Sequence, residues 1–132
     1  MNDAVTEPAA VSFETGLRRC LGRVALYDRI ARRFLETRVD EARKLQAAVD
    51  RGDLAAVRRL AHDIASTAGT LGADGLSATA LALQAAADEG ADAASLVQLA
   101  QRFSSQHAGV LNALAAYARG DVDLKAIASR KS

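Results

Sequence analysis

The chain has 132 residues, 50% of them hydrophobic, and a formal net charge of +1. This length fits one domain with its own core, and the near-neutral charge argues against a general nucleic-acid binder, which needs a net basic surface. No apolar run approaches the roughly 18 residues of a membrane span. Cys20 is the single cysteine, which excludes an internal disulfide and favours a reducing compartment. We therefore expect a cytoplasmic monomer that binds neither nucleic acid nor membrane.

Ala and Leu dominate the hydrophobic residues, and strand formers never cluster in alternation, so the chain is predicted to be all-α. Residues 1–11 show no periodicity and are expected to form a loose arm. Ser12 can cap a short helix that runs to about Leu21. A long amphipathic helix is predicted from about Arg23 to Asp50. Its expected inward stripe consists of Leu26, Ile30, Phe34, Ala42, Leu45 and Val49.

Three further amphipathic helices are predicted. The first covers about residues 54–71, the second ends at about Ala87, and the third ends at about Tyr117. Asp53 is suited to cap the first of these helices. Short loops between long helices imply antiparallel neighbours. The sequence therefore predicts an up-down antiparallel four-helix bundle with a short extra N-terminal helix, together covering residues 12–119. Residues 120–132 are expected to form a C-terminal tail that is frayed or adds one weak helical turn.

The most informative segment covers residues 60–76 and reads LAHDIASTAGTLGADGL. The apolar stripe of this helix uses Val57, Ala61, Ile64 and Ala68, and His62 lies well off that stripe. We therefore expect the His62 ring to face solvent. A neutral, exposed imidazole is a usable nucleophile at neutral pH, although a lone exposed His on a helix is more often an ordinary surface residue.

The helical neighbours of His62 are small on one side and basic on the other. Arg58 and Arg59 lie one turn before it. Gly69 lies inside the helix, where it costs about 1 kcal/mol relative to Ala, so either a partner or a neighbouring helix is expected to approach closely there. The small residues predicted to form a partner-docking surface are Ala65, Ser66 and Gly69.

This segment resembles the phosphoacceptor segment of histidine-phosphotransfer domains. The similarity lies in Ala61-His62-Asp63-Ile64, in Ser66-Thr67-Ala68 and in Leu71-Gly72-Ala73, followed by Leu76. Leu26-Tyr27, the Arg-Arg-Phe-Leu run at 32–35 and Gly52-Asp53-Leu54 are also similar to the family. The resemblance covers about residues 13–118, and its specificity comes from the combined spacing.

The resemblance implies a phosphorelay intermediate whose His62 carries a phosphoryl group between receiver domains that are phosphorylated on aspartate. The expected partners are response-regulator receiver domains, a hybrid sensor kinase, or both. The family often orients the acceptor ring with a Gln on the following helix, and Gln84 occupies a suitable position. A solvated surface amide is an equally good interpretation of Gln84.

The sequence departs from the family at two positions. The usual Lys three residues after the acceptor is Ala65, and the usual Gly after that Lys is Ser66. The missing Lys removes a charge that could pair with phosphate, and Arg58 or Arg59 could replace it from the other side. The alternative function is a docking module of similar fold that binds a regulator without phosphotransfer.

An enzyme is the weakest interpretation. His62 and His107 are the only histidines, so no zinc-type cluster is expected, and neither a G-x-G-x-x-G motif nor a P-loop occurs. Asp63 projects about 100° away from His62 around a helix, which argues against a catalytic pair. His107 lies near the inward stripe of the last helix and is expected to have a packing role. We therefore predict a phosphoryl carrier without a kinase site, metal or cofactor.

Overall fold

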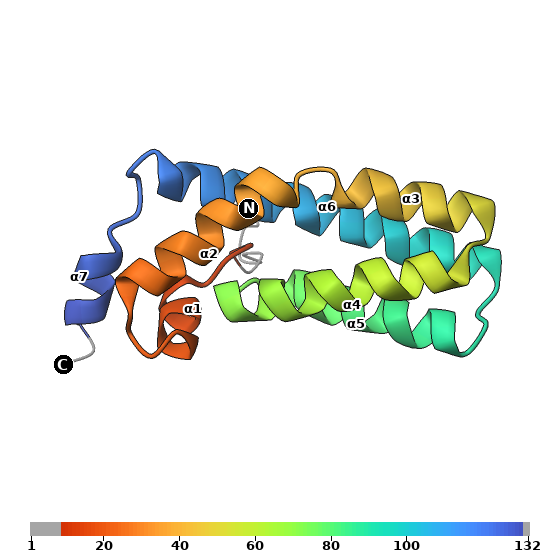
Figure 1. Cartoon of the computed structure of the whole chain (residues 1–132), viewed down its shortest axis with the longest axis horizontal. Helices are drawn as coiled ribbons and strands as arrows, with labels where there is room; N and C mark the ends of the chain where they lie inside the picture. Colours follow the sequence, from red (N-terminus) through yellow and green to blue (C-terminus); the bar gives the residue numbers. More distant parts are fainter. Residues whose placement is uncertain (1–8, 131–132) are drawn as a thin grey trace, which may run out of the picture.

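The computed structural model describes residues 9–130, and within them the chain forms seven helices and no strand (Figure 1). The all-α prediction is thus confirmed, whereas most of the expected loose arm over 1–11 lies outside the described residues. The helices are α1 (Phe13–Arg19), α2 (Val24–Thr37), α3 (Glu41–Arg51), α4 (Leu54–Leu71), α5 (Asp74–Asp88), α6 (Ala93–Ala118) and α7 (Leu124–Ser129).

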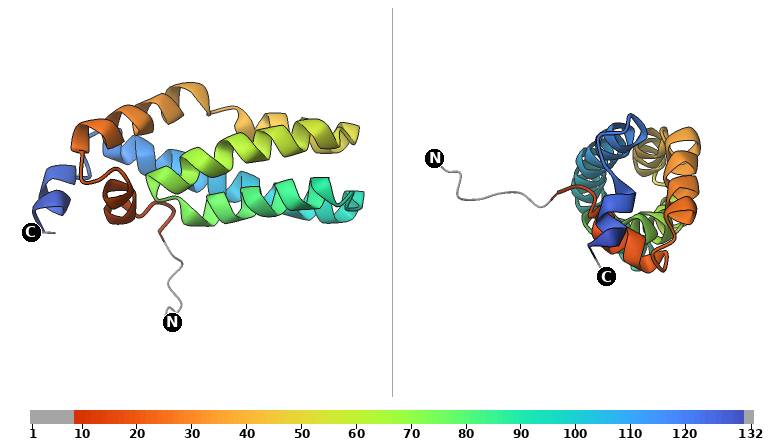
Figure 2. Two further views of the ribbon diagram at one scale, coloured as in Figure 1. Left: turned by 60° about the horizontal axis from the view of Figure 1, so that its bottom comes forward. Right: turned by 90° about the vertical axis from the view of Figure 1, so that its left-hand side faces the viewer.

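Four helices, α3 to α6, lie side by side along the long axis of the molecule (Figures 1 and 2). Helix α2 crosses this group at an angle, and α1 and α7 cover one end of it. Helix α4 contacts α1, α2, α3 and α5. It is therefore surrounded on most sides and buries more of its circumference than a surface helix with one neighbour.

The predicted long helix from Arg23 to Asp50 is wrong, because the chain breaks at residues 38–40 into α2 and α3. The carbonyl oxygen of Arg38 lies 2.8 Å from Nε2 of His107 on α6, so a tertiary hydrogen bond holds this carbonyl at the end of α2. The break rotates α2 relative to α3. As a result Tyr27 and Ala31 are buried there, while Leu26 and Ile30 of the expected stripe are only half-buried.

Local capping sets the ends of α4 where they were predicted. The Asp53 carboxylate accepts a hydrogen bond from the backbone N–H of Ala56 at 3.1 Å, which satisfies one of the free donors of the first turn. Gly72 ends the helix with φ of +88°, a conformation that favours glycine. A Cβ at Gly72 would also collide with the carbonyl of Ser12, so the segment before α1 packs directly on this turn.

The end of the molecule that holds α1 and α7 is closed by aromatic side chains. The Tyr27 hydroxyl donates a hydrogen bond of 2.7 Å to the carbonyl of Leu71, and the Tyr27 ring packs against Phe13 and Tyr117. The C-terminal segment, expected either to fray or to add a weak helical turn, contains the short helix α7, which packs against α1 and α2 and buries Leu124. Among the described residues no helix is long and apolar enough to cross a membrane.

Candidate functional site

His62 lies in the middle of α4, and its side chain is exposed, as its offset from the apolar stripe predicts. Val57, Ala61 and Ile64 on the opposite side of the same helix are each 0% exposed. The imidazole is therefore held on a rigid element whose other face is anchored in the core. Its position on the surface follows from the helical period alone.

The three small residues predicted to form one surface beside His62 are placed differently from one another. Ser66 is exposed and Gly69 is half-buried, but Ala65 is only 6% exposed, so its expected place on the open surface is wrong. The reason is that α5 lies directly against α4 at this point. Ser77 of α5 donates a hydrogen bond of 2.8 Å to the carbonyl of Ala65.

Gly69 lies at the edge of the α4–α5 contact. A Cβ added there would meet Ser77 Oγ at 3.4 Å, which is ordinary van der Waals contact, so helix packing does not require glycine at this position. The Gly69 carbonyl accepts a hydrogen bond from Arg19, which also pairs with Asp74 at 2.6 Å. The hydrogen bond from Arg19 to the Asp74 carboxylate lowers the pKa of that carboxyl.

The two arginines before His62 have different partners. Arg58 pairs with Asp88 at the end of α5, with Nε and Oδ1 2.6 Å apart. Arg59 has no ion pair within residues 9–130, and it lines a hollow between α3 and α4. Arg59 is thus the less compensated of the two charges next to His62.

The contacts between α4 and α5 set the position of Gln84. Ser77 meets Ala65, and Asp88 meets Arg58, so the two helices run antiparallel and Gln84 faces the turn of α4 that holds His62. Gln84 is half-buried, and its side-chain oxygen is buried without a hydrogen-bond partner among the described residues. A buried amide oxygen in this state has an acceptor available for a nearby donor.

The outward face of α5 was not singled out from the sequence. Leu81 is 54% exposed there, and Ala78, Ala82 and Ala85 are exposed beside it. Between its terminal residues Asp74 and Asp88, α5 carries no charged residue. Because apolar residues occur all around α5 and only a few polar ones interrupt them, its sequence has little periodic contrast that could have revealed which apolar residues stay outside.

A family model for the Hpt domain matches residues 29–120, which is more than half of the chain. The chain belongs to the Hpt domain family. Domains of this family act in histidine phosphotransfer within two-component phosphorelays. No curated protein and no solved structure matches the chain.

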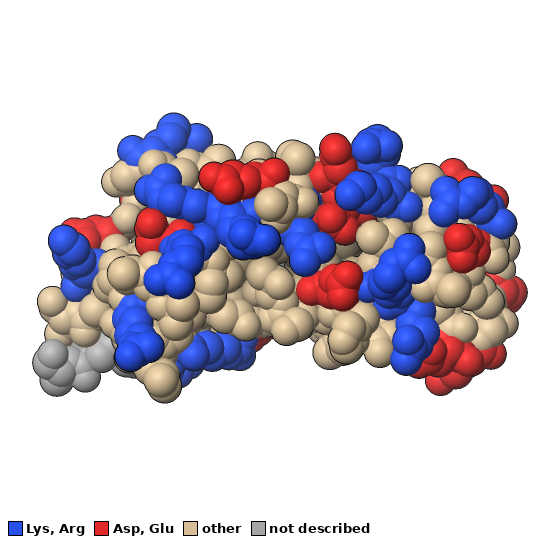
Figure 3. Space-filling view, in the orientation of Figure 1, with Lys and Arg blue, Asp and Glu red and all other residues tan. Residues whose placement is uncertain are grey.

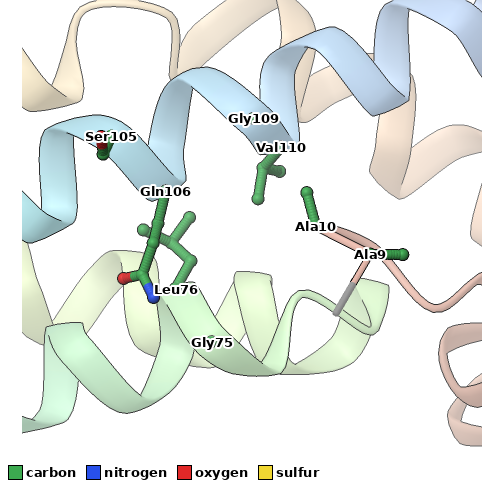
Figure 4. Close-up of a pocket in the computed structure, with 8 residues that line it drawn as sticks. All are labelled: Ala9, Ala10, Gly75, Leu76, Ser105, Gln106, Gly109 and Val110. Carbon is green, nitrogen blue, oxygen red and sulfur yellow. The ribbon is translucent and has the colours of Figure 1, made fainter. Parts of the chain in front are cut away.

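One pocket and the second histidine of this Hpt domain involve α5 and α6 rather than α4. A pocket of about 330 Å³ lies between α5 and α6 (Figure 4) and is lined by Gly75, Leu76, Gln106 and other small or apolar residues, none of them titratable. His107 is 2% exposed and stacks on Phe103, which agrees with a packing role. Within residues 9–130 no three His, Cys, Asp or Glu side chains are grouped so that they could hold a metal ion.

Proposed function

We propose that His62 is the phosphoacceptor of this Hpt domain and that the chain relays a phosphoryl group between aspartate-phosphorylated receiver domains. The observation that carries the proposal is the exposed imidazole on the middle of α4, with Ser66 and Gly69 leaving room beside it. Phosphoryl transfer needs a close and aligned approach of donor and acceptor. Bulky side chains at these two positions would prevent that approach.

The transfer itself needs one nucleophilic ring nitrogen. Its lone pair forms a P–N bond while the P–O bond of the donor's acyl phosphate breaks, and the donor carboxylate leaves with the electron pair. The proton on the other ring nitrogen stays on the ring or passes to water. The reverse step delivers the group to a second receiver, so the chain is a carrier without a kinase site of its own.

We infer that Gln84 orients the His62 ring. Gln84 lies opposite the turn of α4 that holds His62, and its buried oxygen, which has no partner among the described residues, can accept a hydrogen bond from the ring N–H. This bond would fix the tautomer and leave the other ring nitrogen free to attack. Gln84→Leu keeps most of the volume and removes the acceptor, so phosphotransfer to His62 should slow while the fold is retained.

We infer that α3 to α6 form an up-down antiparallel four-helix arrangement. We also infer that the receiver docks over the exposed parts of α4 and α5 in this arrangement. Leu81 is a large apolar side chain beside the small residues of α5, and such a residue is a typical anchor of an interface. Leu81→Glu should weaken receiver binding about tenfold or more. Leu21→Glu is the matched control, because Leu21 is 83% exposed in the turn after α1.

Labelling experiments test the central proposal. Phosphorylated receiver domains from the same organism should transfer label to the wild-type chain and to Asp63→Ala, but not to His62→Ala. An exposed position should change the free energy of unfolding by only about 0.5 kcal/mol, so both variants should fold. Full labelling of His62→Ala, or label that survives acid, would place the acceptor at another residue.

The second candidate is a docking module without phosphotransfer, which Ala65 in place of the family's Lys favours. In that case receivers would bind the chain, and the Leu81→Glu substitution would weaken binding, but no acid-labile label would appear on His62. Binding and labelling measured on the same receiver panel therefore separate the two functions.

A further inference from the structure

The hollow between α3 and α4 has an unusual lining. Its charged side chains are Arg43, Lys44, Arg51 and Arg59, its other walls are Ala47, Ala56 and Leu60, and its volume is about 320 Å³. Lys44 also lines the adjoining hollow under α2, whose other charged lining residues are Arg33, Arg38 and Glu41. Figure 3 shows many Lys and Arg side chains on the face that α2, α3 and α4 form, with Asp and Glu side chains interspersed among them.

Three of the four cations in the α3–α4 hollow each have one acidic partner, and these partners do not line the hollow itself. Arg43 and Arg51 lie 3.4 Å and 3.5 Å from Asp40 and Asp53, and Lys44 lies 3.9 Å from Glu41. These distances exceed the 2.6 Å of the ion pair between Arg58 and Asp88.

Arg59 has no ion pair among the described residues. The exposed carboxylates Asp50 and Asp63 are on the same two helices but do not line the hollow. Because Arg59 is not paired within residues 9–130 and no carboxylate lines the hollow, its inside can accept an anion.

The hollow adjoins the surface of His62, because Arg59 belongs to both. Residues three apart on a helix are neighbours, so an anion held at Arg59 lies within one turn of the acceptor ring. On the other side of His62 the exposed face of α5 is uncharged. His62 thus lies at the boundary between a cationic half and an apolar half of one surface.

We propose that the α3–α4 hollow receives an acidic segment of the receiver that docks at His62, and that it fixes the orientation of that receiver. The proposal rests on the proposed function for the identity of the partner. The partner presents carboxylate side chains towards α3 and apolar side chains towards α5. Complementary charge of this kind steers association and excludes the reversed orientation.

The test compares two pairs of substitutions in the full chain. Arg43→Gln with Arg51→Gln neutralises two charges of the hollow, and Arg102→Gln with Arg119→Gln neutralises two exposed charges on and just after α6. Arg119 is a close match, because it is 65% exposed and pairs with Asp121 at 3.2 Å, much as Arg51 pairs with Asp53. Both pairs change the net charge equally.

Receiver binding is measured at low salt and at 1 M salt, with the receivers that bind the wild-type chain. The double substitution in the hollow, Arg43→Gln with Arg51→Gln, should lower the association rate about fivefold at low salt. The difference in rate from the wild-type chain should vanish at 1 M salt, where the screening length is about 3 Å. The control pair should behave like the wild-type chain. Phosphoramidate, a small donor that needs no docking, should label His62 equally in all three proteins.

Several results would overturn the inference. Equal loss of binding in both pairs would mean that only net charge matters, and no loss in the hollow pair would mean that the receiver does not reach α3. Tighter binding to a 20-base-pair DNA duplex than to any receiver, or no receiver bound at all, would also refute it. A different outcome separates the two proposals. If receivers bind with the expected salt dependence but leave no label on His62, the proposed phosphotransfer is refuted, whereas the docking inference still holds.

Discussion

Replacing Arg59 by Ala should disfavour the phosphorylated state of His62, whereas replacing Arg58 should have a smaller effect. The family's Lys is absent at position 65, and both arginines lie one turn before the acceptor. Arg58 is bound to Asp88 at 2.6 Å, so part of its charge is already compensated. Arg59 has no such partner within residues 9–130 and is the better replacement for the missing Lys.

The expected magnitude follows from the helical spacing. Side chains three apart begin about 6 Å from each other, and a phosphoryl group carries a charge of about −2. In water the Coulomb energy of one cation at that distance is about 1.4 kcal/mol. A screening length of about 8 Å at physiological salt leaves roughly half, or about 0.7 kcal/mol. This corresponds to about a threefold change in the equilibrium constant of transfer.

The assay is the partition of radiolabel between a receiver and the Hpt domain at equilibrium, measured for wild type, Arg58→Ala and Arg59→Ala. In Arg59→Ala the ratio of label on the receiver to label on the Hpt domain should rise about threefold at physiological salt. This difference from the wild-type chain should disappear at 1 M salt. A larger shift in Arg58→Ala, or a shift in Arg59→Ala that persists at 1 M, would refute the electrostatic argument.

Other predictions concern stability and its dependence on pH. Gly16→Ala should lower the free energy of unfolding by about 1–3 kcal/mol in urea titrations, because a Cβ at Gly16 would stand 2.7 Å from the carbonyl carbon of Leu71. Gly69→Ala should instead raise it by about 0.5–1 kcal/mol, since the added Cβ meets only an ordinary contact. The hydrogen bond from Arg19 lowers the folded-state pKa of Asp74, so this pair stabilises the fold above about pH 4 and loses its effect as the pH falls through the lowered pKa. Asp74→Asn should accordingly flatten the loss of stability in acid, and an unchanged acid titration would contradict that role.

Features that depend on a few neighbouring residues could be predicted from the sequence. Asp53 and Gly72 mark the ends of α4, and both act locally through a cap and a left-handed turn. The exposure of His62 follows from the offset between its position and the stripe that includes Ala61 and Ile64. None of these predictions needed to know which helix packs against which.

The errors arise where a distant residue decides the local structure. At the break after Arg38, the Arg38 carbonyl is hydrogen-bonded to His107, which is far away along the chain. Ala65 was placed outside because one stripe was assigned to α4, but this helix has several neighbours and Ser77 of α5 covers that side as well. Leu81 escaped attention for the opposite reason, since an apolar helix gives no contrast between its inner and outer faces.

The burial of Ala65 bears on the choice between a phosphoryl carrier and a docking module. A Lys at position 65 would have to run its stem out along α5 before its charge could reach solvent, because the Cβ position is closed off. The loss of that Lys therefore leaves the outward surface around His62 unobstructed and removes only a charge. Arg59 stands on the open side of the same helix and can supply a charge there, so Ala65 is compatible with phosphotransfer. A docking module would need the apolar face of α5 and the cationic hollow, but it would give no reason for an imidazole to stand between them.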